Sequence, residues 1–177
     1  MRSALIAACC TGCLAMGFGI GLAAKDAKFP GIDAIRGKPA KEAALAALAE
    51  AEIVAKDGTW ERLGVARVYY LALDKPRGQA LIDAVLAGKK AKGTDFQRAG
   101  QIYDEAGEKG RAEEMFQRAL SFDAKDDTGQ AEVGAWYIRN GQREKGEELL
   151  GRAFAKNPDE VWHYVRAAEA LMNLPPR

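Results

Sequence analysis

The sequence predicts an all-α fold in which antiparallel helix pairs stack into a solenoid. Three observations support this prediction: an apolar pattern that recurs every 34 residues, helical spacing within each recurrence, and glycines placed between the expected helices. Neither helix of such a pair can bury its apolar stripe alone, so consecutive pairs must pack on one another. At 177 residues and 48% hydrophobic content, the chain is large enough for one domain with its own core.

The recurrence consists of columns in which side-chain size is constant. A shift of 34 residues, without a gap, superimposes a small column made of Ala66, Gly100, Gly134 and Ala168. Three residues further along is a large column made of Tyr69, Tyr103, Tyr137 and Leu171. In the second half of each unit a further small column contains Gly78, Ala112 and Gly146. Agreement of this kind without an insertion predicts a repeat architecture.

Each recurrence contains a helix, a short turn and a second helix. One apolar stripe has helical spacing at Ala112, Met115, Phe116, Ala119 and Leu120. Gly107 and Gly141 supply the break expected just past a helix end. We therefore expect single helices at about 40–55 and 159–173, and helix pairs at about 59–88, 93–122 and 127–156.

These residues resemble the tetratricopeptide repeat (TPR) family. The unit from Gly93 to Asp126 matches best, through Phe96, Ala99, Gly100, Tyr103, Gly107, Ala112, Phe116 and Ala119. The unit from Thr59 departs from the family pattern because Leu73-Asp74-Lys75-Pro76 replaces the glycine turn, which leaves its turn geometry open. The resemblance implies a right-handed α-solenoid over residues 40–174, with about three full 34-residue repeats and a half-repeat at each end.

Residues 1–24 differ in composition from the rest of the chain. Arg2 precedes an uncharged stretch over residues 4–24, and Gly21-Leu22-Ala23 provides the small residues of a cleavage site. This pattern predicts a signal peptide cleaved after Ala23 or, if it is retained, an inner-membrane anchor formed by residues 4–24. In both cases we expect the rest of the chain to be exported to the periplasm or envelope.

Two further features belong to this N-terminal region. Ile6-Ala7-Ala8-Cys9 resembles a lipobox, which makes Cys9 a candidate for lipidation. Residues 25–39 contain Pro30, Gly31, Gly37 and Pro39 and predict an extended linker.

Charge and composition exclude several classes of function. The 26 basic and 25 acidic residues nearly cancel, so nothing indicates the concentrated basic face that nucleic acid requires. All cysteines, Cys9, Cys10 and Cys13, lie in the leader, and the single histidine, His163, is expected at the surface or in a helix cap. Ser121 and His163 lack any sign of an oxyanion hole. We expect no enzyme activity, no cofactor and no metal site.

In TPR proteins the first helix of each pair lines a concave groove that receives peptides or partner helices. The resemblance implies that the groove contains Trp60, Leu63, Arg67, Tyr70, Leu71, Gln97, Gln101, Asp104, Glu105, Ala131, Ala135, Ile138, Arg139, Trp162, Val165, Glu169 and Met172. Such a groove has aromatic ends and a polar, acidic middle, a combination that peptide recognition commonly uses. An alternative is that Trp60 and Trp162, which lie in terminal units, only seal the core there.

The main functional hypothesis is therefore an exported adaptor or scaffold that holds a protein or peptide partner in a multi-protein assembly of the cell envelope. The alternative is a membrane-anchored structural module that self-associates through its terminal helices. The oligomeric state, the partner and the pathway stay open at this point.

Overall fold

The computed structural model describes residues 31–175, and every regular element in this range is a helix. Three helices occupy the N-terminal part, α1 (Ala40–Ala55), α2 (Thr59–Val68) and α3 (Lys75–Leu86). The others are α4 (Gly93–Glu105), α5 (Lys109–Phe122), α6 (Asp127–Arg139), α7 (Arg143–Lys156) and α8 (Val161–Leu171). These bounds confirm the expected positions of the helices.

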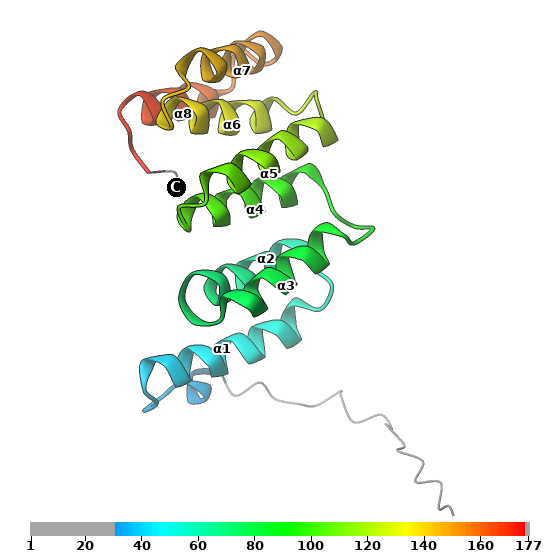
Figure 1. Cartoon of the computed structure of the whole chain (residues 1–177), viewed down its shortest axis with the longest axis vertical. Coiled ribbons are helices and arrows are strands. Elements are labelled where there is room, and N and C mark those ends of the chain that lie inside the picture. The colour runs from blue at the N-terminus through cyan, green and yellow to red at the C-terminus, as the bar shows by residue number, and fades with distance from the viewer. Residues whose placement is uncertain (1–30, 176–177) are drawn as a thin grey trace, which may run out of the picture.

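The helices are arranged as consecutive pairs along one long axis (Figure 1). α2 packs on α3, α4 on α5, and α6 on α7, while α1 and α8 stand unpaired at the two ends. The first helices of the pairs also contact one another in order, α2 with α4, α4 with α6, and α6 with α8. We call the surface that these four helices form the first-helix surface.

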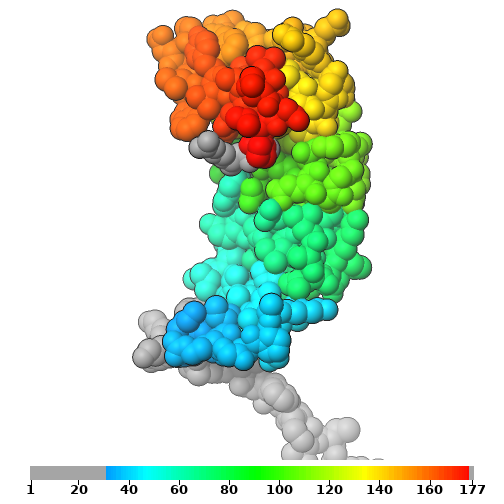
Figure 2. Space-filling model, turned by 90° about the vertical axis from the view of Figure 1, so that its left-hand side faces the viewer, coloured from blue at the N-terminus to red at the C-terminus, as the bar shows by residue number. Residues whose placement is uncertain are grey.

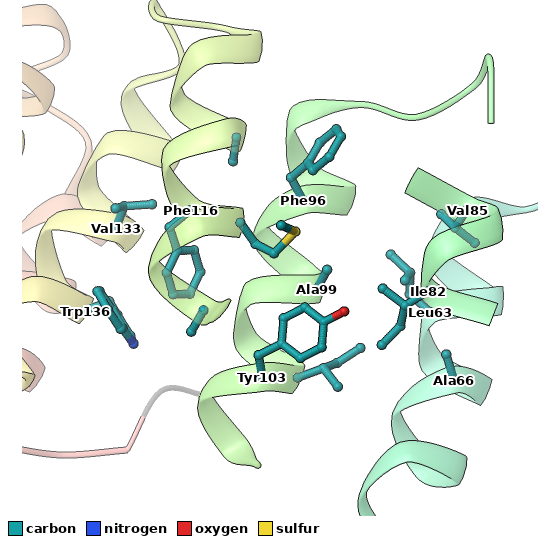
Figure 3. Close-up of a cluster of buried hydrophobic side chains, with 14 of the residues drawn as sticks. Leu63, Ala66, Ile82, Val85, Phe96, Ala99, Tyr103, Phe116, Val133 and Trp136 are labelled. Carbon is teal, nitrogen blue, oxygen red and sulfur yellow. The ribbon is translucent and has the colours of Figure 1, made fainter. Parts of the chain in front are cut away.

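A continuous apolar core runs between the pairs. Its members include Leu63, Ile82, Phe96, Tyr103, Phe116 and Trp136 (Figure 3). Three members of the large column lie inside the core, because Tyr69, Tyr103 and Tyr137 are only 1–2% exposed. The small column permits close approach of the paired helices: a Cβ built on Gly146 would lie 2.5 Å from the carbonyl oxygen of Gly134. Both kinds of column are therefore explained by helix packing.

The turn between α2 and α3 differs from the other two. Gly107 and Gly141 end α4 and α6 with φ values of 77° and 78°, the left-handed conformation that glycine adopts without strain. No glycine is present after α2, and the chain instead widens into a π-helical turn, η2 (Tyr69–Leu73). Asp74 then caps α3, since its carboxylate accepts a 3.0 Å hydrogen bond from the Arg77 amide. The sequence Leu73-Asp74-Lys75-Pro76 thus forms a tight turn without glycine, through the π-helical turn and the Asp74 cap.

The segment before α1 is less extended than the sequence predicts. A short 3₁₀ helix, η1 (Gly31–Ala34), precedes α1 and lies against it. This corrects the expectation of a fully extended linker for residues 31–34, whose amides and carbonyls form local turns. The predicted leader, including Cys9, lies outside the described residues.

Candidate partner-binding surface

A hollow opens in the first-helix surface between α4 and α6. It spans about 570 Å³, including its open mouth, and most of the residues that line it are polar or charged. The lining residues are Gln97, Arg98, Gln101, Asp104, Glu105, Phe116, Glu132, Trp136 and Arg139. In Figure 2 the left-hand edge of the molecule is concave between its two ends. Gln97, Gln101, Asp104, Glu105 and Arg139, all predicted from the sequence, are thereby brought together.

The carboxylates of the hollow already have partners within the chain. Asp104 accepts a 2.8 Å hydrogen bond from the Trp136 indole and also pairs with Lys109. Glu105 accepts a 2.7 Å hydrogen bond from Arg67 Nε, which raises the pKa of the Arg67 guanidinium. Glu132 accepts a 2.5 Å hydrogen bond from Arg166 Nε. These acidic groups consequently have little capacity left for a cationic ligand.

Two guanidinium groups in the hollow retain unused donors. Arg98 Nε is buried without a hydrogen-bond partner among the described residues, and Arg98 Nη1 makes only a 3.3 Å bond to Gln101. Arg139 makes no hydrogen bond or ion pair within residues 31–175. Burial lowers the pKa of Arg139, while the nearby charges of Asp104 and Glu132 raise it. An arginine stays protonated despite such a shift, so the hollow presents positive charge that no carboxylate of the described residues contacts directly.

Exposed tryptophans extend the surface on both sides of the hollow. Trp60 on α2 is 55% exposed, and the Arg98 guanidinium lies 4.9 Å from its ring centroid. Trp162 on α8 is 61% exposed and lies 5.8 Å from the Arg166 guanidinium. More than half of the surface of each tryptophan is thus open to solvent in the described part of the chain. On each side of the hollow an exposed tryptophan thus lies beside an arginine, and the interaction of the cation with the ring is favourable.

Several residues predicted for the groove are part of the packing instead. Leu63, Ala131 and Ala135 are fully buried, and Tyr70 is 4% exposed. The prediction that these residues present a groove surface is wrong, because their side of the first helix packs against the neighbouring pair. Tyr70 still has a polar role, since its hydroxyl donates to Glu108 at 2.9 Å.

The remaining predicted residues are not among those that line the hollow, and they differ in exposure. Arg67, Ile138 and Val165 are half-buried, and Glu169 is buried and accepts a 2.7 Å bond from Arg166. Leu71 in η2 and Met172, directly after α8, are exposed. A second, shallower hollow beside Leu71 is lined by Tyr70, Lys75, Glu105 and Ala106.

A comparison with solved structures finds the same architecture in the crystal structure of MamA. The two chains share 15% sequence identity, with a TM-score of 0.51 over 74% of this chain and 76% of the MamA chain. This chain has the fold of a TPR-like helical solenoid. No family model and no curated protein matches the sequence.

The solenoid places four lining residues in the hollow that the sequence reasoning missed: Arg98, Phe116, Glu132 and Trp136. Helical spacing contains a signal for two of them. Arg98 directly follows Gln97, and Glu132 occupies the same place one 34-residue period later. Arg98 and Glu132 therefore border the helix face that the resemblance assigns to the groove.

Other polar candidates in the solenoid are structural. His163 is 1% exposed, with its Nε2 3.5 Å from Asp127 and its ring near Phe154, so the expectation of a surface or capping histidine is wrong. The Ser121 hydroxyl donates to the Gln117 carbonyl of its own helix.

Within residues 31–175, no group of three or more histidine, cysteine or acidic residues is placed to hold a metal ion. None of the helices in this range has the length and hydropathy needed to cross a membrane.

Proposed function

We propose that this protein is a non-enzymatic adaptor that binds a protein segment on its first-helix surface. The observation that carries this proposal is the hollow between α4 and α6, in which Arg139 has no ion-pair partner within the described residues. A TPR-like solenoid, as seen in MamA, is the fold of a protein-interaction scaffold and supports the same function. Solenoids present extended binding surfaces of this kind.

The chemistry of the surface defines the segment it would bind. The unused donors of Arg98 and Arg139 favour a carboxylate, since a guanidinium can form two parallel hydrogen bonds to one. Trp60 and Trp162, on either side, offer apolar contact area at low entropic cost. We therefore propose a partner segment with an acidic side chain between apolar ones.

Affinity capture with the full chain tests the proposal. The test variant combines Trp60→Ala, Arg139→Gln and Trp162→Ala, which leaves the buried residues of the core intact. The control variant is Ile53→Ala, because Ile53 is also exposed but lies on α1 away from the hollow. Circular dichroism first establishes that all three proteins are folded to the same extent.

We expect one protein to be captured by the parent and by Ile53→Ala, and to be lost with the triple variant. A synthetic peptide from that protein should then bind the parent, and replacement of its acidic side chain by the amide should weaken binding by roughly tenfold or more. Equal capture by the parent and the triple variant would show that the first-helix surface is not the binding site.

For the location of the protein we propose export, with residues 1–24 acting as a signal peptide or as an inner-membrane anchor. This rests on the uncharged stretch over residues 4–24 and the small residues before Ala24. N-terminal sequencing of the protein from fractionated cells distinguishes the alternatives. A mature chain beginning at Ala24 indicates cleavage, Met1 in the membrane fraction indicates an anchor, and a blocked Cys9 that incorporates labelled fatty acid indicates lipidation. Met1 in the cytoplasmic fraction would contradict export.

The second candidate function is a structural module that self-associates through its terminal helices. One observation favours it independently of the hollow. The apolar side chains Val54 on α1 and Val161 and Leu171 on α8 are exposed at opposite ends of the solenoid.

A further inference from the structure

The C-terminal helix α8 has an inverted distribution of polarity. Its charged residues face inward, where Arg166 pairs with both Glu132 and Glu169 and only 16% of its side chain is exposed. Its outward face consists of Val161, Tyr164, Ala168, Leu171 and Met172, all of them exposed. A helix that caps a solenoid needs a polar outer face to keep the end soluble. α8 does not meet this requirement, which indicates that another element covers it.

The repeat identifies what kind of element is missing. Leu171 occupies the column of Tyr69, Tyr103 and Tyr137, yet it is 52% exposed where the tyrosines are 1–2% exposed. The tyrosines are covered by the second helix of their own pair, and no such helix follows α8 within residues 31–175. The uncovered face of α8 is therefore shaped to receive a second helix of the repeat.

The opposite end of the chain carries an unpaired second helix. α1 precedes the first full pair and contacts α2, and no first helix lies before it within the described residues. In the repeat, Ala44 aligns with Gly78, Ala112 and Gly146, the small residues that let a first helix approach. Around Ala44, the outer stripe of α1 contains Ala40, Ala47 and Val54 and no charged residue, while Ala51 beside it packs against the cluster of Leu48. This stripe faces the place that a first helix would occupy.

The 34-residue register pairs specific residues of the two ends. Asp127 and Lys156 form a 2.9 Å ion pair between α6 and α7, and their equivalents in the terminal helices are Val161 and Val54. Val161 and Val54 are 66% and 58% exposed. The two positions that form an ion pair in the full repeat are therefore both apolar in the terminal helices. Asp57 and Lys90 also form an ion pair, and their equivalents are Asp159 and Lys56, which again have opposite charges. Both matches favour docking between the ends of two copies.

We propose that copies of this protein associate head to tail, with α8 of one copy and α1 of the next forming a complete helix pair. The outer face of α8, including Leu171, packs on the alanine stripe of α1 in the second copy. The two ends are too far apart to meet within one chain (Figure 1). The interface is heterologous, so a dimer keeps one free α1 and one free α8, and the assembly extends into an open chain or closes into a ring.

Analytical ultracentrifugation of the purified full chain under reducing conditions tests this proposal. We expect the average mass of the parent to rise with concentration beyond that of a dimer. Val54→Glu and Leu171→Glu should each weaken association by at least roughly tenfold, because each buries an unpaired carboxylate in an apolar interface. The matched controls are Ile53→Glu, which is on the other side of α1, and Trp162→Glu, which is on the first-helix surface of α8. Both controls should associate as the parent does.

Mixing the two variants distinguishes this interface from nonspecific association. Val54→Glu retains an intact α8, and Leu171→Glu retains an intact α1. An equimolar mixture should therefore form a one-to-one dimer that does not grow, although each variant alone stays monomeric. A parent that is monomeric at every concentration, or a mixture that stays monomeric, would overturn the proposal. The proposal would also be overturned if each variant alone associated as tightly as the parent.

The proposal rests on the second candidate function, self-association through the terminal helices, and is independent of partner binding at the hollow. The end variants leave Trp60 and Arg139 unchanged, so affinity capture by Leu171→Glu should match that of the parent. Loss of association with retained capture, or the reverse, identifies which of the two functions fails.

Discussion

At the scale of single residues, the most concentrated set of charges surrounds Glu108. Its carboxylate pairs with Lys75 at 2.6 Å and Arg111 at 2.9 Å and accepts a hydrogen bond from Tyr70 at 2.9 Å. The Lys75 contact, followed by those of Tyr70 and Arg111, lowers the pKa of Glu108 from 4.5 to about 2. Glu108 thereby ties the turn after α4 to the α2–α3 pair.

This shift predicts a pH dependence of stability. A carboxylate with a lowered pKa stabilises the folded state above pH 4.5, and the contribution is lost as the pH falls through about 2. Glu108→Gln should reduce the free energy of unfolding at pH 7 by about 1–2 kcal/mol, a value discounted for the exposed partners. Urea titrations at pH 7 and near pH 2 measure the difference between parent and variant. The difference should shrink at the lower pH, and a constant difference would contradict the assignment.

Two glycines of α7 predict opposite effects of the same substitution. A Cβ on Gly146 would meet the Gly134 carbonyl oxygen at 2.5 Å and Ile138 at 2.6 Å, so Gly146→Ala should cost about 1–3 kcal/mol of stability. Nothing lies within 4 Å of a Cβ on Gly151 in the same helix. Gly151→Ala should instead stabilise the protein by roughly 0.5–1 kcal/mol, since alanine has the better helix propensity. Thermal unfolding followed by circular dichroism compares the two, and a loss of similar size in both would argue against close packing at Gly146.

At the scale of the elements, the α2–α3 turn is held by one side chain rather than by a glycine. The Asp74 carboxylate satisfies the Arg77 amide at the start of α3. Asp74→Ala should therefore lower the free energy of unfolding by about 1 kcal/mol, and Asp74→Asn by less, because asparagine also caps helices. Asp83→Ala, in the exposed part of α3, is the control and should change it by less than about 0.5 kcal/mol. Chemical denaturation of the three variants checks the order.

The elements show how far the sequence predicts this fold. Helix positions follow from spacing and turn glycines, because both report local backbone preferences. The π-helical turn at Tyr69–Leu73 could not be predicted in the same way. The sequence only shows that the glycine is missing, while the geometry depends on how Asp74 and Pro76 start the next helix.

The candidate site was predicted less completely than the helices, for a physical reason. Leu63, Gln97 and Ala131 occupy one column of the repeat, but Leu63 and Ala131 are buried and Gln97 lines the hollow. Their exposure depends on the angle at which successive pairs cross, and no local pattern encodes that angle. The same angle brings Trp136 of α6 to Asp104 of α4, a contact between residues that are 32 positions apart.

At the scale of the whole molecule, binding and assembly use different surfaces. The hollow lies in the middle of the first-helix surface, whereas the uncovered apolar faces belong to α1 and α8 at the ends. Head-to-tail association therefore leaves the hollow of every copy accessible and aligns successive hollows along the assembly. Binding of a multivalent partner should then be tighter than binding to a single copy, and Leu171→Glu should abolish this gain. Titration of a tandem peptide against parent and variant measures the gain, and equal affinity for both would contradict it.

The one-sided support of the terminal helices also affects their motion. α8 is held mainly by α6, and α1 mainly by α2, whereas α4 and α6 are enclosed by neighbours on both sides. In an isolated copy the ends should fray and exchange their amide hydrogens faster than the middle, as segments with few neighbours do. Joining two copies would give each terminal helix the neighbour it lacks. Amide hydrogen exchange that becomes slower in α1 and α8 but not in α4 and α6 would then indicate head-to-tail assembly.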